Sequence, residues 1–311
     1  MGRLSLRKVY LSPHTLTFLG TQGDPGRTLF SVIGVPLDST SSFRSGTRFA
    51  PYSIRLMSQS LETMSLRTGI DVEDYAPYDE GNVSISHGNV DLSLRYVEAV
   101  CEDLVREGRL PILLGGEHTI SVGSIRGIFK ALGSDTCYLV LDAHADYRSE
   151  YLGFKLSHAC TTRRVRELLG PSNVFIIGLR ALSKDELRSL KVDGVRYVTS
   201  IDVLRLGARE VARRVNDFKS TCSRLYVSID MDVFDPAYAP GVTTPEPEGL
   251  SPTLVFGVLS RVLDKSVVGI DVVEVSPPYD VGMITSALAA KVVLESIAYI
   301  VASGGAVTSH P

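Results

Sequence analysis

Short apolar segments alternate with segments of helical spacing along most of the chain, from about residue 29 to residue 303. The apolar segments have the length and β-branched character of buried strands, and they cover residues 29–35, 110–114, 137–141, 174–178, 195–199, 224–229 and 267–275. The helical segments between them cover residues 92–107, 121–132, 161–169, 184–190, 203–218 and 252–263. Parallel strands require crossover connections, so this alternation predicts an α/β fold with a mostly parallel sheet covered by helices on both faces.

The chain shows no sign of division into several domains. No repeat, low-complexity tract or Pro/Ser-rich linker interrupts its 311 residues, and we expect a single domain over residues 1–311, with residues 1–28 as an N-terminal extension packed on it. The long apolar stretch at 284–303 carries Lys291 and Glu295 in its middle, which favours a buried helix over a membrane span.

Charge and cysteine content narrow the class of protein further. The 32 Lys and Arg residues nearly balance the 35 Asp and Glu residues, and without a run of positive charge we expect no nucleic-acid partner. The N-terminus lacks the apolar block of a secretory signal, so the expected location is the cytoplasm. Cysteines at 101, 137, 160 and 222 have no CxxC spacing and are expected to be free thiols.

Acidic and histidine side chains follow three of the predicted strands. Residues 115–118 read Gly-Gly-Glu-His, residues 142–146 read Asp-Ala-His-Ala-Asp, and residues 230–232 read Asp-Met-Asp. Extended backbone alternates its side chains, so residues two apart point the same way, and parallel strands bring their carboxyl ends to one edge of the sheet. The residues expected to meet there are His118, Asp142, His144, Asp146, Asp230 and Asp232.

Four carboxylates and two imidazoles in one crevice would repel each other unless cations neutralised them. Six side chains are too many for one ion and suit two, and oxygen-rich ligands without thiolate favour a manganese-type ion over zinc. Two ions about 3.5–4 Å apart lower the pKa of a water between them toward neutrality. The sequence therefore predicts a dinuclear metal centre that catalyses hydrolysis.

Two further residues complete a candidate mechanism. His158 follows Asp146 by 12 positions on a predicted loop, and a histidine there could shuttle protons at neutral pH. Glu274 ends the last strand in an apolar setting, where its carboxylate would pair with a planar cation such as a guanidinium. The Gly115-Gly116 pair lacks a phosphate-loop pattern, so we expect it to serve close backbone packing at the metal.

Five ordered strings, GGEHTIS, DAHAD, SHAC, SIDMDVFDP and EVSPP, resemble the arginase, agmatinase and related ureohydrolase family. The resemblance implies a three-layer α/β/α sandwich with a parallel eight-stranded sheet, two Mn²⁺ ions per subunit, and hydrolysis of a guanidino group to urea and an amine. It also implies bridging roles for Asp142 and Asp230. The residues implied for one ion are His118, Asp142, Asp146 and Asp230, and those for the other are Asp142, His144, Asp230 and Asp232. His158 matches the family's proton shuttle, Glu274 its guanidinium-binding glutamate, and Thr244 a threonine that lines the substrate cleft.

The substrate is predicted from what this chain lacks. Arginases usually carry an aspartate after Gly-Leu-Arg, where this chain has Ala181, and residues 147–156 lack the pattern that holds an α-carboxylate. Agmatine is therefore the expected substrate, and arginine, guanidinobutyrate, guanidinopropionate and formiminoglutamate are the alternatives, since enzymes for them share the metal site. A catalytically silent binding subunit is a further alternative. By resemblance we expect a homo-oligomer, either a trimer or a hexamer. Its expected ligand is a small guanidino substrate, and we expect no association with a membrane.

Overall fold

The computed structural model describes residues 7–304, and its centre is a twisted sheet. The described residues contribute nine strands to this sheet, in the order β1-β5-β2-β6-β11-β10-β7-β8-β9. Their bounds are β1 Leu11–Ser12, β2 Phe30–Gly34, β5 Tyr78–Val83, β6 Leu110–Leu114, β7 Thr136–Leu141, β8 Val174–Leu179, β9 Arg196–Thr199, β10 Arg224–Asp230 and β11 Val267–Val273. A separate two-stranded sheet pairs β3 (Met64–Ser65) with β4 (Ile70–Asp71).

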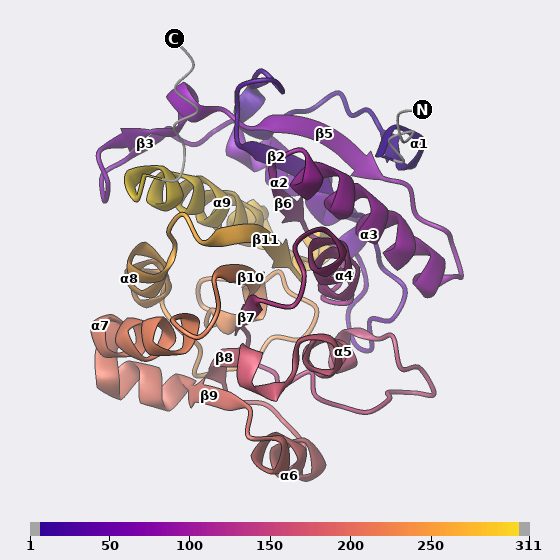
Figure 1. Cartoon of the computed structure of the whole chain (residues 1–311), viewed down its shortest axis with the longest axis vertical. Coiled ribbons are helices and arrows are strands. Elements are labelled where there is room, and N and C mark those ends of the chain that lie inside the picture. Colours follow the sequence, from indigo (N-terminus) through magenta and orange to yellow (C-terminus); the bar gives the residue numbers. More distant parts are fainter. Residues whose placement is uncertain (1–6, 305–311) are drawn as a thin grey trace.

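Helices cover both faces of the sheet, so the molecule has the three layers expected (Figure 1). The helices are α1 Arg7–Tyr10, α2 Ala50–Ser58, α3 Val90–Arg106, α4 Ile120–Leu132, α5 Thr161–Leu169, α6 Lys184–Asp193, α7 Ser200–Lys219, α8 Pro252–Val262 and α9 Ile284–Ala302. One apolar core packs α2, α7, α8 and α9 against the sheet, and the other packs α3, α4, α5 and α6 against the opposite face. This arrangement confirms the predicted α/β fold, because buried parallel strands need cover on both sides.

The sheet differs from the expected eight strands by one short addition at its edge. Strands β2 and β5 to β11 run parallel to their neighbours, and β1 pairs antiparallel with β5 through Leu11 and Ser12. The sequence patterns predicted seven of the eight parallel strands and missed β5. Its sequence, YDEGNV, lacks an apolar run, and its side chains alternate between buried and partly exposed, as in a strand near a sheet edge.

Helix α9 occupies the predicted position of the long apolar stretch. It is long and apolar enough to cross a membrane by composition, but 78 % of its most apolar window is buried inside the protein. The Glu295 carboxylate is buried with it, where it forms an ion pair with Lys291 and accepts a hydrogen bond from Ser65. The apolar composition of α9 is therefore explained by its packing against the sheet, α2 and α8.

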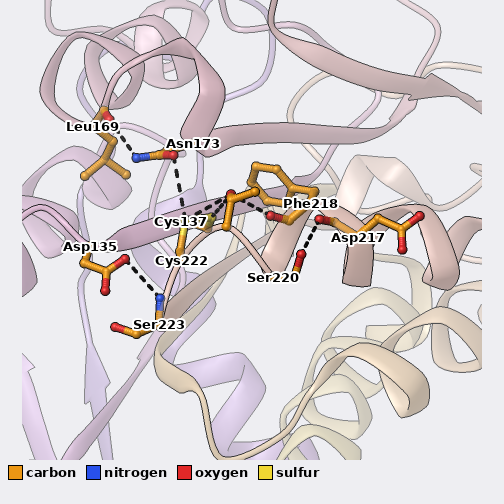
Figure 2. Close-up of a disulfide and its surroundings, with 10 residues drawn as sticks. Asp135, Cys137, Leu169, Asn173, Asp217, Phe218, Ser220, Cys222 and Ser223 are labelled. Atoms are coloured by element: carbon orange, nitrogen blue, oxygen red, sulfur yellow. Dashed lines mark hydrogen bonds between the residues drawn. A yellow bond between two sulfur atoms is a disulfide. The ribbon is translucent and has the colours of Figure 1, made fainter.

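The expectation of four free thiols is wrong, because Cys137 and Cys222 form a disulfide (Figure 2). Cys137 lies at the amino end of β7, and Cys222 lies in the turn before β10. The Asp135 carboxylate accepts a hydrogen bond from the Ser223 backbone N–H and joins the same two segments. Since β7 and β10 are neighbours only in the sheet, and 85 positions separate the cysteines, no local spacing in the sequence could indicate the pair.

Candidate active site

The order of the strands brings all the predicted clusters to one edge of the sheet. Strands β6, β11, β10 and β7 are consecutive neighbours in space. Residues 115–118, Glu274, residues 230–232 and residues 142–146 lie at or directly after the carboxyl ends of these strands. The site is thus assembled from four adjacent strands, in the position where open α/β sheets bind ligands.

Five of the six predicted metal-binding side chains converge into two overlapping groups. One group contains His118, Asp142 and Asp146, and the other contains Asp142, His144 and Asp232. His118 Nδ1 lies 2.9 Å from an Asp146 carboxylate oxygen and 3.2 Å from one of Asp142.

The remaining distances bring Asp230 and His144 into the same cluster. An Asp230 carboxylate oxygen lies 3.3 Å from His118 Nδ1. His144 Nδ1 lies 2.8 Å from an Asp232 carboxylate oxygen and 3.7 Å from one of Asp142. Asp142 belongs to both groups and therefore links them.

The hydrogen bonds of His118 leave one nitrogen available for a cation. Its Nε2 lies 3.0 Å from Ser228 Oγ, and that hydroxyl donates its own hydrogen to the buried Asp271 carboxylate. Ser228 can therefore only accept from His118, so Nε2 carries the proton and the Nδ1 lone pair faces the carboxylates. Within residues 7–304, neither His118 Nδ1 nor Asp142 Oδ2 has a hydrogen-bond partner.

The charges in the cluster also require compensation. Burial and the neighbouring Asp142 charge raise the pKa of Asp146 to about 7, and burial raises the pKa of Asp230 well above its usual value. Burial opposes a charge on His118, yet without a cation the carboxylates around it raise its pKa, so a bound cation would take the place of a proton on Nδ1. A positive charge between these groups would relieve the repulsion, and the orphaned lone pair and carboxylate oxygen show that divalent cations fit there.

His158 lies in the wall of the same cavity. Its backbone N–H donates to Thr40 Oγ1 at 3.0 Å, and its Nε2 lies 3.3 Å from Ser42 Oγ. The Tyr151 ring meets the imidazole edge-on, with 5.8 Å between ring centroids. Burial, together with the nearby His144 and His118, lowers the pKa of His158 to about 4, so the ring is neutral at neutral pH.

Glu274 projects its carboxylate into the cavity from a strained backbone. Its φ of +67° lies in the left-handed region that few residues other than glycine adopt. One oxygen accepts the His118 backbone N–H at 2.5 Å, and the other accepts the hydroxyl of Thr243. Burial raises the pKa of Glu274 to about 8, and a bound cation would favour its ionised form.

The cavity has a volume of about 350 Å³ and opens between several loops. His144, Asp146, Asp230, Asp232, His158, Glu274 and Thr244 all line it. Around its walls the structure adds residues that the sequence patterns did not single out, namely Ser42, Arg148, Tyr151, Leu182, Glu186 and Glu246. Ala181, where arginases carry an aspartate, also lines the cavity.

Two further residues that support the site, Thr243 and Arg180, were not singled out from the sequence. Thr243 holds Glu274, whereas its neighbour Thr244 lies 3.4 Å from an Asp232 carboxylate oxygen, and nothing local distinguishes the two threonines. Arg180 donates to the backbone carbonyls of Asp232, at 2.6 Å, and Glu246, at 2.9 Å. The guanidinium therefore ties a predicted metal-binding loop to the cavity wall.

The Gly115-Gly116 pair has the close packing expected of it. Gly116 has a φ of +104°, and a Cβ there would lie 2.3 Å from the Val35 carbonyl oxygen. The neighbouring Glu117 N–H donates to the Leu37 carbonyl. Glycine thus lets the β6 loop approach the segment after β2, which forms another wall of the site.

Comparison with known proteins identifies the family. The model of the Arginase family matches residues 29–298. The chain is 35% identical over 268 residues to an agmatinase of Halalkalibacterium halodurans, covering 86% of this chain and 90% of that protein. It is 34% identical over 275 residues to a guanidinobutyrase of Pseudomonas aeruginosa, covering 85% and 84%. The crystal structure of the agmatine ureohydrolase of Thermoplasma volcanium superposes with a TM-score of 0.83 at 38% identity, covering 90% and 92%.

Proposed function

Because this chain belongs to the arginase family, we propose that it is a manganese-dependent ureohydrolase that converts agmatine to putrescine and urea. The observation that carries the proposal is the convergence of His118, Asp142 and Asp146 with His144 and Asp232, three of which line the cavity. The similarity to an agmatinase supports agmatine as the substrate. The similarity to a guanidinobutyrase makes guanidinobutyrate the main alternative.

In this proposal two Mn²⁺ ions are held by the six side chains at the strand ends. His118, Asp142, Asp146 and Asp230 would hold one ion, and Asp142, His144, Asp230 and Asp232 would hold the other. When bound, the two metal ions lower the pKa of a water molecule so that it can attack at neutral pH. The His118 lone pair and the unpartnered Asp142 oxygen support this assignment.

Glu274 binds and orients the guanidinium of the substrate. Its carboxylate is fixed by Thr243 and by the His118 backbone N–H, so it cannot turn away from the cavity. Each oxygen retains a further lone pair for the guanidinium N–H groups, which suits a planar donor. The reacting carbon is thereby held over the residues of the metal site.

His158 moves the proton in this mechanism. Its neutral ring can accept a proton from the attacking water as the water adds to the guanidinium carbon. The tetrahedral intermediate then collapses as the C–N bond to the departing amine breaks. His158 returns its proton to the departing nitrogen, and the hydroxyl proton of the intermediate passes to the same nitrogen as the C=O of urea forms, so urea and a protonated diamine leave the site.

The cavity mouth supports a substrate whose far end is positively charged. Arg148 stacks over Tyr151, with 5.2 Å to the ring centroid, and lies 3.5 Å from the buried Glu186 carboxylate. Glu246 is more accessible: its side chain is 40 % exposed, and its carboxylate lies 3.9 Å from His144 Nε2. The exposed negative charge of Glu246 favours the amine of agmatine over the carboxylate of guanidinobutyrate.

A urea-release assay with added Mn²⁺ tests the proposal. Agmatine and 4-guanidinobutyrate have similar lengths and differ in the sign of the distal charge. We expect faster release from agmatine, with the activity lost in Asp142→Asn and kept in Asp135→Asn, a control at the opposite edge of the sheet. Faster release from 4-guanidinobutyrate would refute agmatine as the substrate, and formamide release from formiminoglutamate would replace the proposed reaction. No product and no metal uptake would indicate a silent binding subunit.

Three broader proposals accompany this function. We expect residues 1–311 to form one domain on which residues 1–28 pack, and within the described part Arg7 pairs with Glu80 and Glu107 on that body. Residues 1–6 of this extension lie outside the described residues. A homo-oligomeric state, trimer or hexamer, and a cytoplasmic location stay predictions. The Cys137–Cys222 disulfide counts against a reducing compartment.

A further inference from the structure

Glu117 is a fully buried carboxylate that the proposed reaction leaves unused. It follows the glycine pair after β6, directly before His118. One of its oxygens accepts the backbone N–H groups of Ser39 and Thr40, at 2.8 and 2.7 Å. The other accepts the hydroxyls of Thr40 and Thr119, at 2.9 and 3.0 Å. Glu117 thus anchors the loop after β2 to the metal-site loop.

The four hydrogen bonds indicate that Glu117 is ionised. A carboxylate has about four acceptor positions, and each position here faces a donor. A proton on either oxygen would therefore lack an acceptor and would displace one of the existing donors.

The bond to Glu117 determines what the Thr40 hydroxyl can do on its other side. Its only hydrogen points at Glu117, so its oxygen can only accept hydrogen bonds from other groups. The His158 backbone N–H donates to this oxygen at 3.0 Å, and His158 Nδ1 lies 3.3 Å from it. Favourable contact with Nδ1 requires a hydrogen on that nitrogen. The Ser157 hydroxyl, 3.4 Å from Nδ1, can accept from the same hydrogen.

We propose that Glu117 and Thr40 are positioning residues that hold His158 in the tautomer protonated at Nδ1. The lone pair of Nε2 then points toward Ser42 and the cavity, ready to accept a proton from the attacking water. The relay runs from a carboxylate through a hydroxyl to an imidazole, and it orients the base without contacting the substrate. This inference rests on the proton-shuttling role that the proposed function gives to His158.

A matched pair of variants separates the hydroxyl from the shape of Thr40. Thr40→Val keeps the shape and removes the hydroxyl, whereas Thr40→Ser keeps the hydroxyl. With agmatine and Mn²⁺, we expect Thr40→Val to lower kcat about tenfold or more, since general acid–base catalysis contributes ~100-fold or more. KM should change little, because Glu274 still binds the guanidinium. Thr40→Ser should retain most of the wild-type kcat.

Thr47→Val is the control for damage to the same loop. Thr47 is buried, and its hydroxyl donates to the Leu37 carbonyl rather than toward His158. It should keep the wild-type kcat. Equal kcat values for Thr40→Val and the wild type, or an equal loss in Thr40→Ser, would overturn the proposal.

A chemical readout tests the tautomer independently of turnover. Diethylpyrocarbonate acylates an unprotonated ring nitrogen, and mass spectrometry of the peptide containing His158 gives its rate in the metal-loaded enzyme. We expect the rate to fall severalfold in Thr40→Val and to stay unchanged in Thr40→Ser. Equal rates in both variants would refute the assigned tautomer. If the wild type released no urea from any guanidino compound, the proposed function would fail, and this comparison would still decide the tautomer.

Discussion

Loss of the Cys137–Cys222 disulfide should lower the stability of the fold without slowing catalysis. The bridge closes a loop spanning 85 positions, and closing a loop of this size removes about 4–5 kcal/mol of chain entropy from the unfolded state. For a chain of this length, an unfolding entropy of about 2.1 cal/mol/K per residue converts that loss into a Tm decrease of about 7 °C. Cys222→Ser is the suitable change because Cys222 is only partly buried.

The effect on activity should be small because of where the bridge lies. It joins the amino ends of β7 and β10, while Asp142 and Asp230 stand at their carboxyl ends. The length of β7 places about 17 Å between Cys137 and Asp142. We therefore expect kcat at 25 °C to remain within twofold of the wild type.

Thermal and urea unfolding with and without dithiothreitol measure the stability change. In dithiothreitol the unfolding free energy of the wild type should fall to that of Cys222→Ser. The unfolding free energy of Cys222→Ser should be the same with and without the reductant. Ser223→Ala is the matched control in the same turn, and it should behave as the oxidised wild type. A loss below about 1 kcal/mol in Cys222→Ser would refute the loop-entropy reasoning. Four free thiols in the unreduced protein would refute the bridge itself.

Three other predictions concern the metal, the substrate tail and the remaining thiols. Chelation should lower Tm, and Mn²⁺ at 100 times its dissociation constant should restore about 2.7 kcal/mol of unfolding free energy per site in the wild type. Calorimetry of Asp142→Asn should show a smaller gain, and a gain equal to that of the wild type would place the ions elsewhere. Glu246→Gln should raise KM for agmatine roughly two- to fivefold, as for an exposed ion pair, and leave KM for butylguanidine unchanged; equal shifts for both compounds would contradict the charge argument. Burial raises the pKa of Cys160 to about 11 and that of Cys101 to about 12, so a thiol reagent at pH 8 should detect no thiol in the native protein and two after non-reducing unfolding. Rapid labelling of the native protein would contradict the burial of these thiols.

The site illustrates which information lies in contiguous residues. The repeated change from apolar strands to amphipathic helices is local, so it indicated a parallel sheet and most helix and strand bounds. Helix α5, for example, begins and ends at the predicted residues, Thr161 and Leu169. The side chains after β6, β7 and β10 could likewise be singled out, because the end of a strand is visible in sequence and such ends share one edge of a parallel sheet.

Longer-range pairings were decided only in the tertiary structure. The order β6-β11-β10-β7 brings four strand ends together, and the contacts of Cys137 with Cys222 and of Glu117 with Thr40 cross between segments distant in the chain. The sequence by itself determined the chemistry available at the sheet edge, through residues such as Asp142 that follow a recognisable strand. The fold decided which groups touch, because side-chain contacts depend on strand order and loop packing, and neither has a local period.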